Sequence, residues 1–74
     1  RGLNSYMTNL KRNEYHSYQN EGKTAKVFLT NEGFEVDFYQ GKELLKTEQH
    51  YGKSEAWAED VADNYVMGIK LLTE

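Results

Sequence analysis

Four acidic residues in the C-terminal third of the chain have a type and spacing that could serve a cation site. Glu55, Glu59 and Asp63 recur every four residues, with Asp60 beside them. On a helix these carboxylates share one face, which could bind a divalent cation or a basic partner. The same pattern is typical of the solvated face of an amphipathic helix, and no calcium-type loop accompanies it. We therefore expect a solvated face, with no metal site and no cofactor.

Other residue types that carry catalysis do not form a recognisable pattern. His16 and His50 lie far apart in the chain, and neither has a Ser or Cys nearby in a nucleophile motif. The glycines occur singly, so the chain has neither a phosphate-binding loop nor a dinucleotide fingerprint. We predict that the chain is not an enzyme, and we assign it no catalytic and no cofactor-binding residue.

Length and composition favour a small domain that gains stability from a partner. The chain has 74 residues and no Cys, so its core is marginal and disulfides cannot support it. Nine basic and twelve acidic residues give a net charge of −3, so we do not expect attraction to nucleic acid or to a membrane surface. Without a signal peptide or a membrane-spanning run, the expected location is the cytoplasm, and the expected partner is a second copy of the chain.

A helix is predicted over residues 54–72. Ser54 is a suitable N-cap, and Gly68 either ends the helix or is tolerated inside it. Large apolar residues recur at four-residue intervals and predict a buried stripe, with small apolar residues beside them. Together they form one broad apolar stripe, which consists of Trp57, Val61, Tyr65 and Ile69 with Ala58, Ala62 and Val66 beside them.

Glycine-containing turns recur every 8 to 11 residues between Gly22 and Gly52, which is typical of a β-meander. Strands are predicted at 24–30, 34–40 and 43–50, with 14–19 as a candidate fourth strand. The expected fold is α+β: a three-stranded or four-stranded antiparallel β-meander with one C-terminal helix packed on one face. Residues 1–13 are expected to be flexible or a short helix, and residues 14–74 to form a single β-β-β-α domain.

The apolar pattern also predicts the strand register. A two-residue turn at 32–33 pairs Val27 with Phe38. The next turn, at 41–42, pairs Asp37 with Lys46 on the outer face. The predicted inner face then consists of Ala25, Val27, Leu29, Phe34, Val36, Phe38, Leu45 and Thr47.

On the opposite sheet face, this register leaves three large apolar side chains exposed: Phe28, Tyr39 and Leu44. We predict that they form the interface of a two-fold homodimer, or bind a host or virion protein. Alternatively, the N-terminal segment covers this face through Met7, Leu10, Tyr15 and Tyr18. The remaining alternatives are a nucleic-acid-binding module, which would use the sheet face or the basic residues Lys11 and Arg12, and a small enzyme.

Two runs in the chain carry a resemblance to known sequences. KVFLTNEGFEVDFYQGKELL and the following GKSEAWAEDVADNYVMGI resemble small uncharacterised proteins of marine bacteriophages and ocean metagenomes. The resemblance covers residues 23–69. It implies a phage or marine microbial origin, and it assigns no activity and no functional residue.

Overall fold

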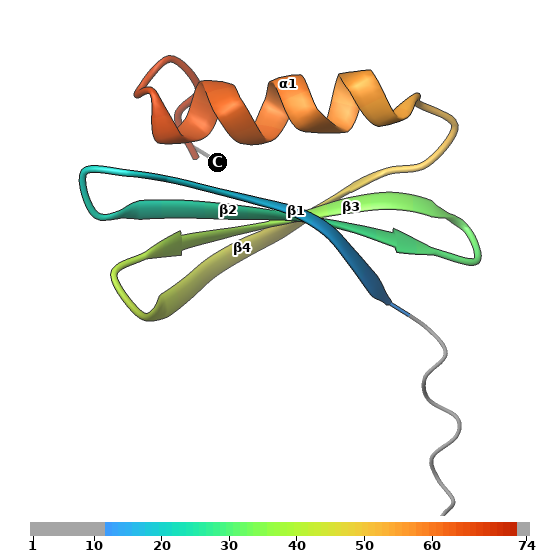
Figure 1. Cartoon of the computed structure of the whole chain (residues 1–74), viewed down its shortest axis with the longest axis horizontal. Helices are drawn as coiled ribbons and strands as arrows, with labels where there is room; N and C mark the ends of the chain where they lie inside the picture. Colours follow the sequence, from blue (N-terminus) through green and yellow to red (C-terminus); the bar gives the residue numbers. More distant parts are fainter. Residues whose placement is uncertain (1–11, 73–74) are drawn as a thin grey trace, which may run out of the picture.

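The computed structural model describes residues 12–72, which form four strands followed by one helix (Figure 1). These elements are β1 (Asn13–Asn20), β2 (Lys23–Thr30), β3 (Gly33–Gln40), β4 (Glu43–His50) and α1 (Glu55–Val66). The strands pair in chain order and every neighbouring pair is antiparallel. The predicted α+β meander with a helix on one face is therefore confirmed, and the candidate strand at 14–19 is β1. The short helix considered for the N-terminal segment falls outside the described residues.

The register between β2 and β3 differs from the predicted one by two residues. Asn31 and Glu32 form the turn, so Val27 lies opposite Val36 rather than Phe38. Gly33 instead begins β3 with a φ of +138°, and a Cβ added to it would lie 3.0 Å from Tyr51, so this position favours a residue without a side chain. A shift of two residues keeps every side chain on its predicted face.

The central strands supply the core as predicted. Four of their side chains are completely buried under α1, and Tyr65 of the helix packs its ring 4.9 Å from the Phe38 ring. These four are Ala25, Val27, Val36 and Phe38. Leu29 and Phe34 are half-buried on the same face.

A β-bulge in β4 changes which of its side chains face the helix. Leu44 pairs with Tyr39, but the next paired residue is Lys46, opposite Phe38, so Leu45 is an extra residue. Leu45 is 46% exposed. The prediction that Leu45 belongs to the inner face is therefore wrong.

Beyond the bulge, the helix side of β4 is polar. Lys46, Glu48 and His50 pair with the inner residues of β3, whereas Thr47 lies opposite Asp37 on the outer face. The predicted inward position of Thr47 and the predicted Asp37–Lys46 pair are thus both wrong, because one extra residue inverts the alternation of the strand. The ammonium of Lys46 lies 3.6 Å from the carboxylate of Glu48 instead.

A second bulge, between Glu14 and His16, gives β1 an extra residue at Tyr15. The Tyr15 ring contacts the Phe34 ring edge-on at 5.7 Å, and Tyr18 packs against the core on the helix side. The alternative in which Tyr15 and Tyr18 cover the opposite face is therefore wrong. The other two residues of that alternative lie outside the described part of the chain.

The helix begins and ends at residues that the sequence marks. Ser54 is the N-cap, and its hydroxyl accepts a hydrogen bond from the backbone N–H of Trp57 at 3.1 Å. At the other end, Met67 is the C-cap and Gly68 follows with a φ of +84°. Gly68 therefore ends the helix as its C′ residue, which is one of the two expectations, and α1 is shorter than the predicted 54–72.

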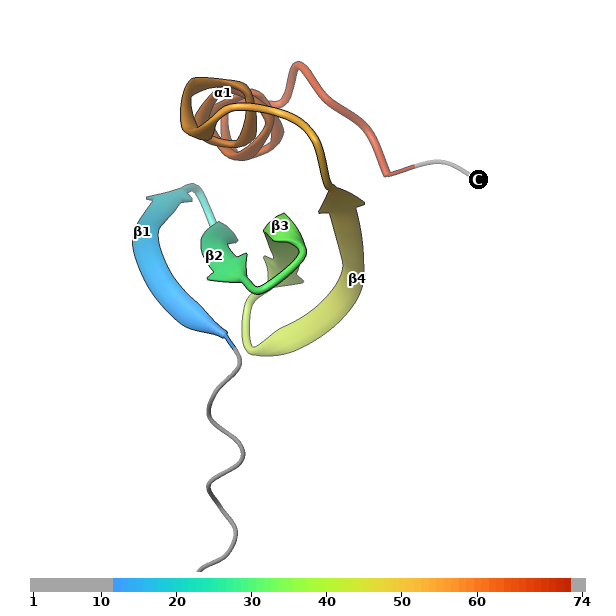
Figure 2. The same cartoon turned by 90° about the vertical axis from the view of Figure 1, so that its right-hand side faces the viewer.

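The buried residues of α1 are one side of the predicted broad apolar stripe. They are Ala58, Ala62, Tyr65 and Val66, and Val61 is half-buried. Trp57 is 46% exposed and Ile69 is 71% exposed, so their predicted burial is wrong. The two alanines let the helix lie close to β1, β2 and β3, while the helix ends before Ile69. The end-on view shows α1 above the sheet and the edge strands β1 and β4 curving on either side of the central pair (Figure 2).

Candidate functional site

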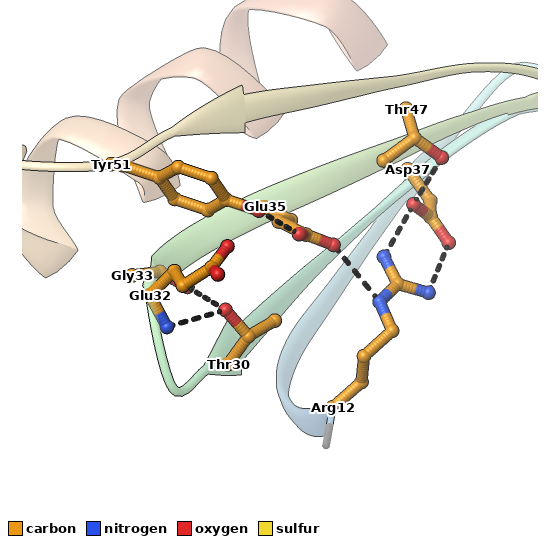
Figure 3. A network of polar contacts seen from close by, with 8 residues as sticks. All are labelled: Arg12, Thr30, Glu32, Gly33, Glu35, Asp37, Thr47 and Tyr51. Atoms are coloured by element: carbon orange, nitrogen blue, oxygen red, sulfur yellow. Dashed lines mark hydrogen bonds and ion pairs between the residues drawn. The ribbon is translucent and has the colours of Figure 1, made fainter.

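On the sheet face away from the helix, a buried carboxylate is the centre of a polar network (Figure 3). Asp37 faces outward as predicted, yet it is only 3% exposed. The guanidinium of Arg12 donates to both of its oxygens, at 2.8 Å and 3.3 Å, and the Thr47 hydroxyl donates at 2.7 Å. This bidentate pair satisfies a charge that would otherwise be costly to bury.

The network continues from Arg12 to Glu35 and Tyr51. Arg12 Nε donates to Glu35 at 3.0 Å, and the Tyr51 hydroxyl donates to the other Glu35 oxygen. The hydrogen bond to Glu35 raises the pKa of Tyr51 to about 12. The hydrogen bond to Asp37, together with the nearby carboxylates, raises the pKa of Arg12 against the opposing effect of burial. The acceptors of this network are occupied by donors of the same chain, which favours a structural role over that of a general base.

The three side chains predicted as an interface lie on this outer face but do not form one patch. The Arg12 guanidinium lies 4.0 Å above the Phe28 ring, and the Lys26 ammonium lies 5.3 Å from the Tyr39 ring. Tyr39 and Leu44 are cross-strand neighbours, and Leu44 is 49% exposed. Phe28 pairs with a residue four positions from Tyr39, which separates them by about 13 Å along the strand. The structure therefore brings Tyr39 and Leu44 together and leaves Phe28 apart.

A hollow lies beside the helix. It has a volume of about 470 Å³ and forms because the backbone reverses after Gly68, where the N–H groups of Ile69 and Lys70 both donate to the carbonyl of Asn64. We call it the α1 groove. Its lining residues are Trp57, Asp60, Val61, Asn64, Ile69 and Lys70.

Side chains of β4 hold two lining residues of the α1 groove in place. The indole N–H of Trp57 donates to His50 Nδ1 at 3.1 Å, so the proton of the ring lies on Nε2, which is 3.0 Å from a Glu48 oxygen. The other Glu48 oxygen lies 3.2 Å from the ammonium of Lys70. Burial alone would raise the pKa of Glu48, but the hydrogen bonds from Lys70 and His50 outweigh burial and lower it. His50 therefore holds Trp57 through Nδ1, and Glu48 orients the imidazole ring through Nε2.

Sequence reasoning missed the α1 groove because it placed Trp57 and Ile69 in the core. Two signals in the chain point to the observed arrangement. Gly68 can end the helix before Ile69, and the adjacent apolar pair Leu44 and Leu45 interrupts the alternation of β4. An interruption of that kind is typical of a bulge, which exchanges the two faces of the following residues.

Comparisons with models of protein families, with curated proteins and with solved structures found no match. The resemblance to phage and metagenome proteins therefore stays a prediction. Within residues 12–72, no helix is long and apolar enough to cross a membrane.

Proposed function

We propose that this chain acts through protein contacts and that the α1 groove is the contact surface of a two-fold homodimer. The observation that carries the proposal is the exposure of Trp57 and Ile69 on the lining of one hollow. Large apolar side chains around a concavity are typical of the centre of a protein interface. The absence of Cys fits the reducing cytoplasm as the compartment of this activity.

The composition of the α1 groove suits a contact between identical surfaces. A two-fold interface must be self-complementary, because each copy presents the same residues to the other. The groove offers a projecting aromatic ring at Trp57 and a hollow beside it. It also carries a carboxylate at Asp60, and the Lys70 ammonium, which Glu48 holds at 3.2 Å, lies on the same lining, so two copies can place Asp60 of one beside Lys70 of the other.

The outer sheet face, where the apolar pattern predicts the dimer, is the weaker candidate for the contact. Arg12 and Lys26 lie over the rings of Phe28 and Tyr39, as Lys53 lies over Trp57 in the α1 groove. The groove differs in carrying Ile69, which is 71% exposed, whereas Leu44 of the outer face is 49% exposed. The pairing of Arg12 argues against nucleic acid as the partner, because this side chain is committed to Glu35 and Asp37. A host or virion protein remains the alternative occupant of the α1 groove.

Sedimentation velocity over a range of protein concentrations tests the proposal. The wild-type chain is expected to shift from monomer to dimer as concentration rises. Ile69→Asp should weaken this association at least tenfold, because it places a charge in the apolar contact. Leu44→Asp is the matched control: it introduces the same charge at an exposed leucine of the outer face and should leave the association unchanged.

The opposite pattern, in which Leu44→Asp abolishes the dimer and Ile69→Asp does not, would move the interface to the outer face. A wild-type chain that stays monomeric at the highest concentration would refute the homodimer. Circular dichroism melts of both variants show whether either substitution affects folding, which is not expected since both side chains are largely exposed.

A further inference from the structure

Between β1 and α1, the fold brings together three side chains that can bind a metal ion. His16 lies on the helix side of β1, opposite Val27, and Glu55 and Glu59 occupy successive turns at the start of α1. One nitrogen of His16 and one oxygen from each carboxylate all lie within 4.8 Å of one another. Two elements that are far apart in the sequence thus converge on one point.

The contact between His16 and Glu59 leaves an acceptor unsatisfied. His16 Nδ1 lies 2.5 Å from Glu59 Oε2. This oxygen is shielded from solvent, and no donor within the described residues is aligned with it as a hydrogen bond. Glu59 Oε2 therefore has an acceptor capacity that no described side chain fills, with an imidazole nitrogen beside it. A metal ion that sets both side chains at its own ligand distances would satisfy both atoms.

The two carboxylates also crowd each other. One oxygen of Glu55 and one oxygen of Glu59 lie within 4.8 Å of each other. Two negative charges at this distance repel each other, and a cation bound by both carboxylates relieves the repulsion. A divalent ion would balance both negative charges.

We propose that His16, Glu55 and Glu59 form a binding site for a divalent transition-metal ion, with Zn²⁺ as the best-suited metal. One imidazole and two carboxylates are a donor set that zinc accepts, and a water molecule can complete a four-coordinate site. Calcium prefers six to eight oxygen ligands, and magnesium prefers six, so the imidazole selects against both. Asp60 and Asp63, which share the acidic character of the helix, lie outside this ligand set.

A metal at this position would tie the edge strand β1 to the helix. The strand is exposed from Asn13 to Ser17, and only Tyr18 and Asn20 of its residues are half-buried. Small domains without disulfides often gain stability from a structural metal. Binding to the folded state alone raises stability by mass action, so zinc should raise the melting temperature of the chain.

Isothermal titration of the full chain with zinc chloride tests the site. We expect one ion per chain and an affinity at least tenfold lower in His16→Ala and in Glu55→Gln. Asp63→Asn is the matched control, because it removes one charge from the same helix outside the ligand set, and it should bind zinc as the wild type does. The melting temperature should rise with zinc in the wild type and in Asp63→Asn, and not in His16→Ala.

Three outcomes would overturn the proposal. They are the absence of zinc binding to the wild type, equal affinities of the wild type and His16→Ala, and an equal loss of affinity in Asp63→Asn and Glu55→Gln, which would indicate diffuse attraction to an acidic surface. Glu55 is exposed, so Glu55→Gln keeps the test valid if His16→Ala proves less stable. Magnesium chloride at the same concentration should leave the melting temperature unchanged.

Discussion

The two faces of the sheet are stabilised by different interactions. On the helix face, apolar side chains from β2, β3 and α1 form a core that excludes water, and the Phe38 and Tyr65 rings meet there. On the outer face no helix from residues 12–72 covers the sheet, and Arg12 connects Asp37 and Glu35 through charged hydrogen bonds. The difference shows that this small sheet closes one face by apolar burial and the other by a polar network.

The comparison also indicates where unpaired surface remains. The hydrogen-bonding groups of the outer network are matched within the chain. Cations lie over the Phe28 and Tyr39 rings of the outer face and also over Trp57 on the helix side, so the exposed aliphatic side chain of Ile69 makes the difference. On the helix face, the apolar core does not extend over β4. The bulge turns Lys46, Glu48 and His50 toward the helix side, so this edge of the face is polar. The α1 groove lies at this boundary, which is why its apolar side chains are the better candidates for a partner.

The largest expected effect comes from the helix face. Phe38→Ala removes a completely buried ring that packs on Tyr65, and should lower the free energy of unfolding by about 3–5 kcal/mol. Urea denaturation followed by circular dichroism measures this loss. If Phe38→Ala lowered the free energy of unfolding less than Asp37→Ala does, the outer face would contribute more to stability than the helix face.

On the outer face, Asp37→Ala should lower the free energy of unfolding by about 1–3 kcal/mol. The substitution deprives Arg12 and Thr47 of their shared acceptor, but Arg12 is 38% exposed and can be solvated again by water. Thr47→Val is the control, since it removes one donor and keeps the ion pair, and it should cost about 1 kcal/mol. If Asp37→Ala were neutral, the network would contribute nothing net to stability.

Local sequence patterns predict which side chains of β2 and β3 face the helix, because successive side chains of a strand point to opposite faces and the buried ones are apolar. Val27, Val36 and Phe38 therefore lie on the predicted face, although the predicted turn is one residue too far along the chain. An error of one residue at both ends of a turn shifts the register by two, and the alternation hides it. Ser54 as the N-cap is equally predictable, because capping depends on local geometry.

The ion pair of the outer face depends on a contact that local patterns do not contain. Arg12 reaches Asp37 across 25 positions of sequence, and nothing near either residue indicates the other. The bulges at Tyr15 and Leu45 invert the faces of β1 and β4 beyond them, and only the one at Leu45 has a local signal, the adjacent apolar pair Leu44 and Leu45. In the helix, the four-residue spacing of the large apolar side chains predicts that Trp57 and Ile69 are buried. The side chains that are buried against the sheet include Ala58 and Ala62, because small side chains allow close packing.

The smallest expected effect tests whether the outer network is formed in solution. Tyr51 should titrate at about 12 rather than at 10.0, because its hydroxyl donates to Glu35 in the folded state. A pKa that folding raises contributes stability below pH 10.0, and this contribution is lost as the pH rises from 10.0 to about 12. The tyrosinate absorbance of the wild type minus that of Tyr51→Phe isolates this group, with circular dichroism confirming that the chain is folded. Glu35→Gln should return the difference signal toward pH 10.0, and a wild-type signal already complete at that pH would mean that Tyr51 and Glu35 do not pair.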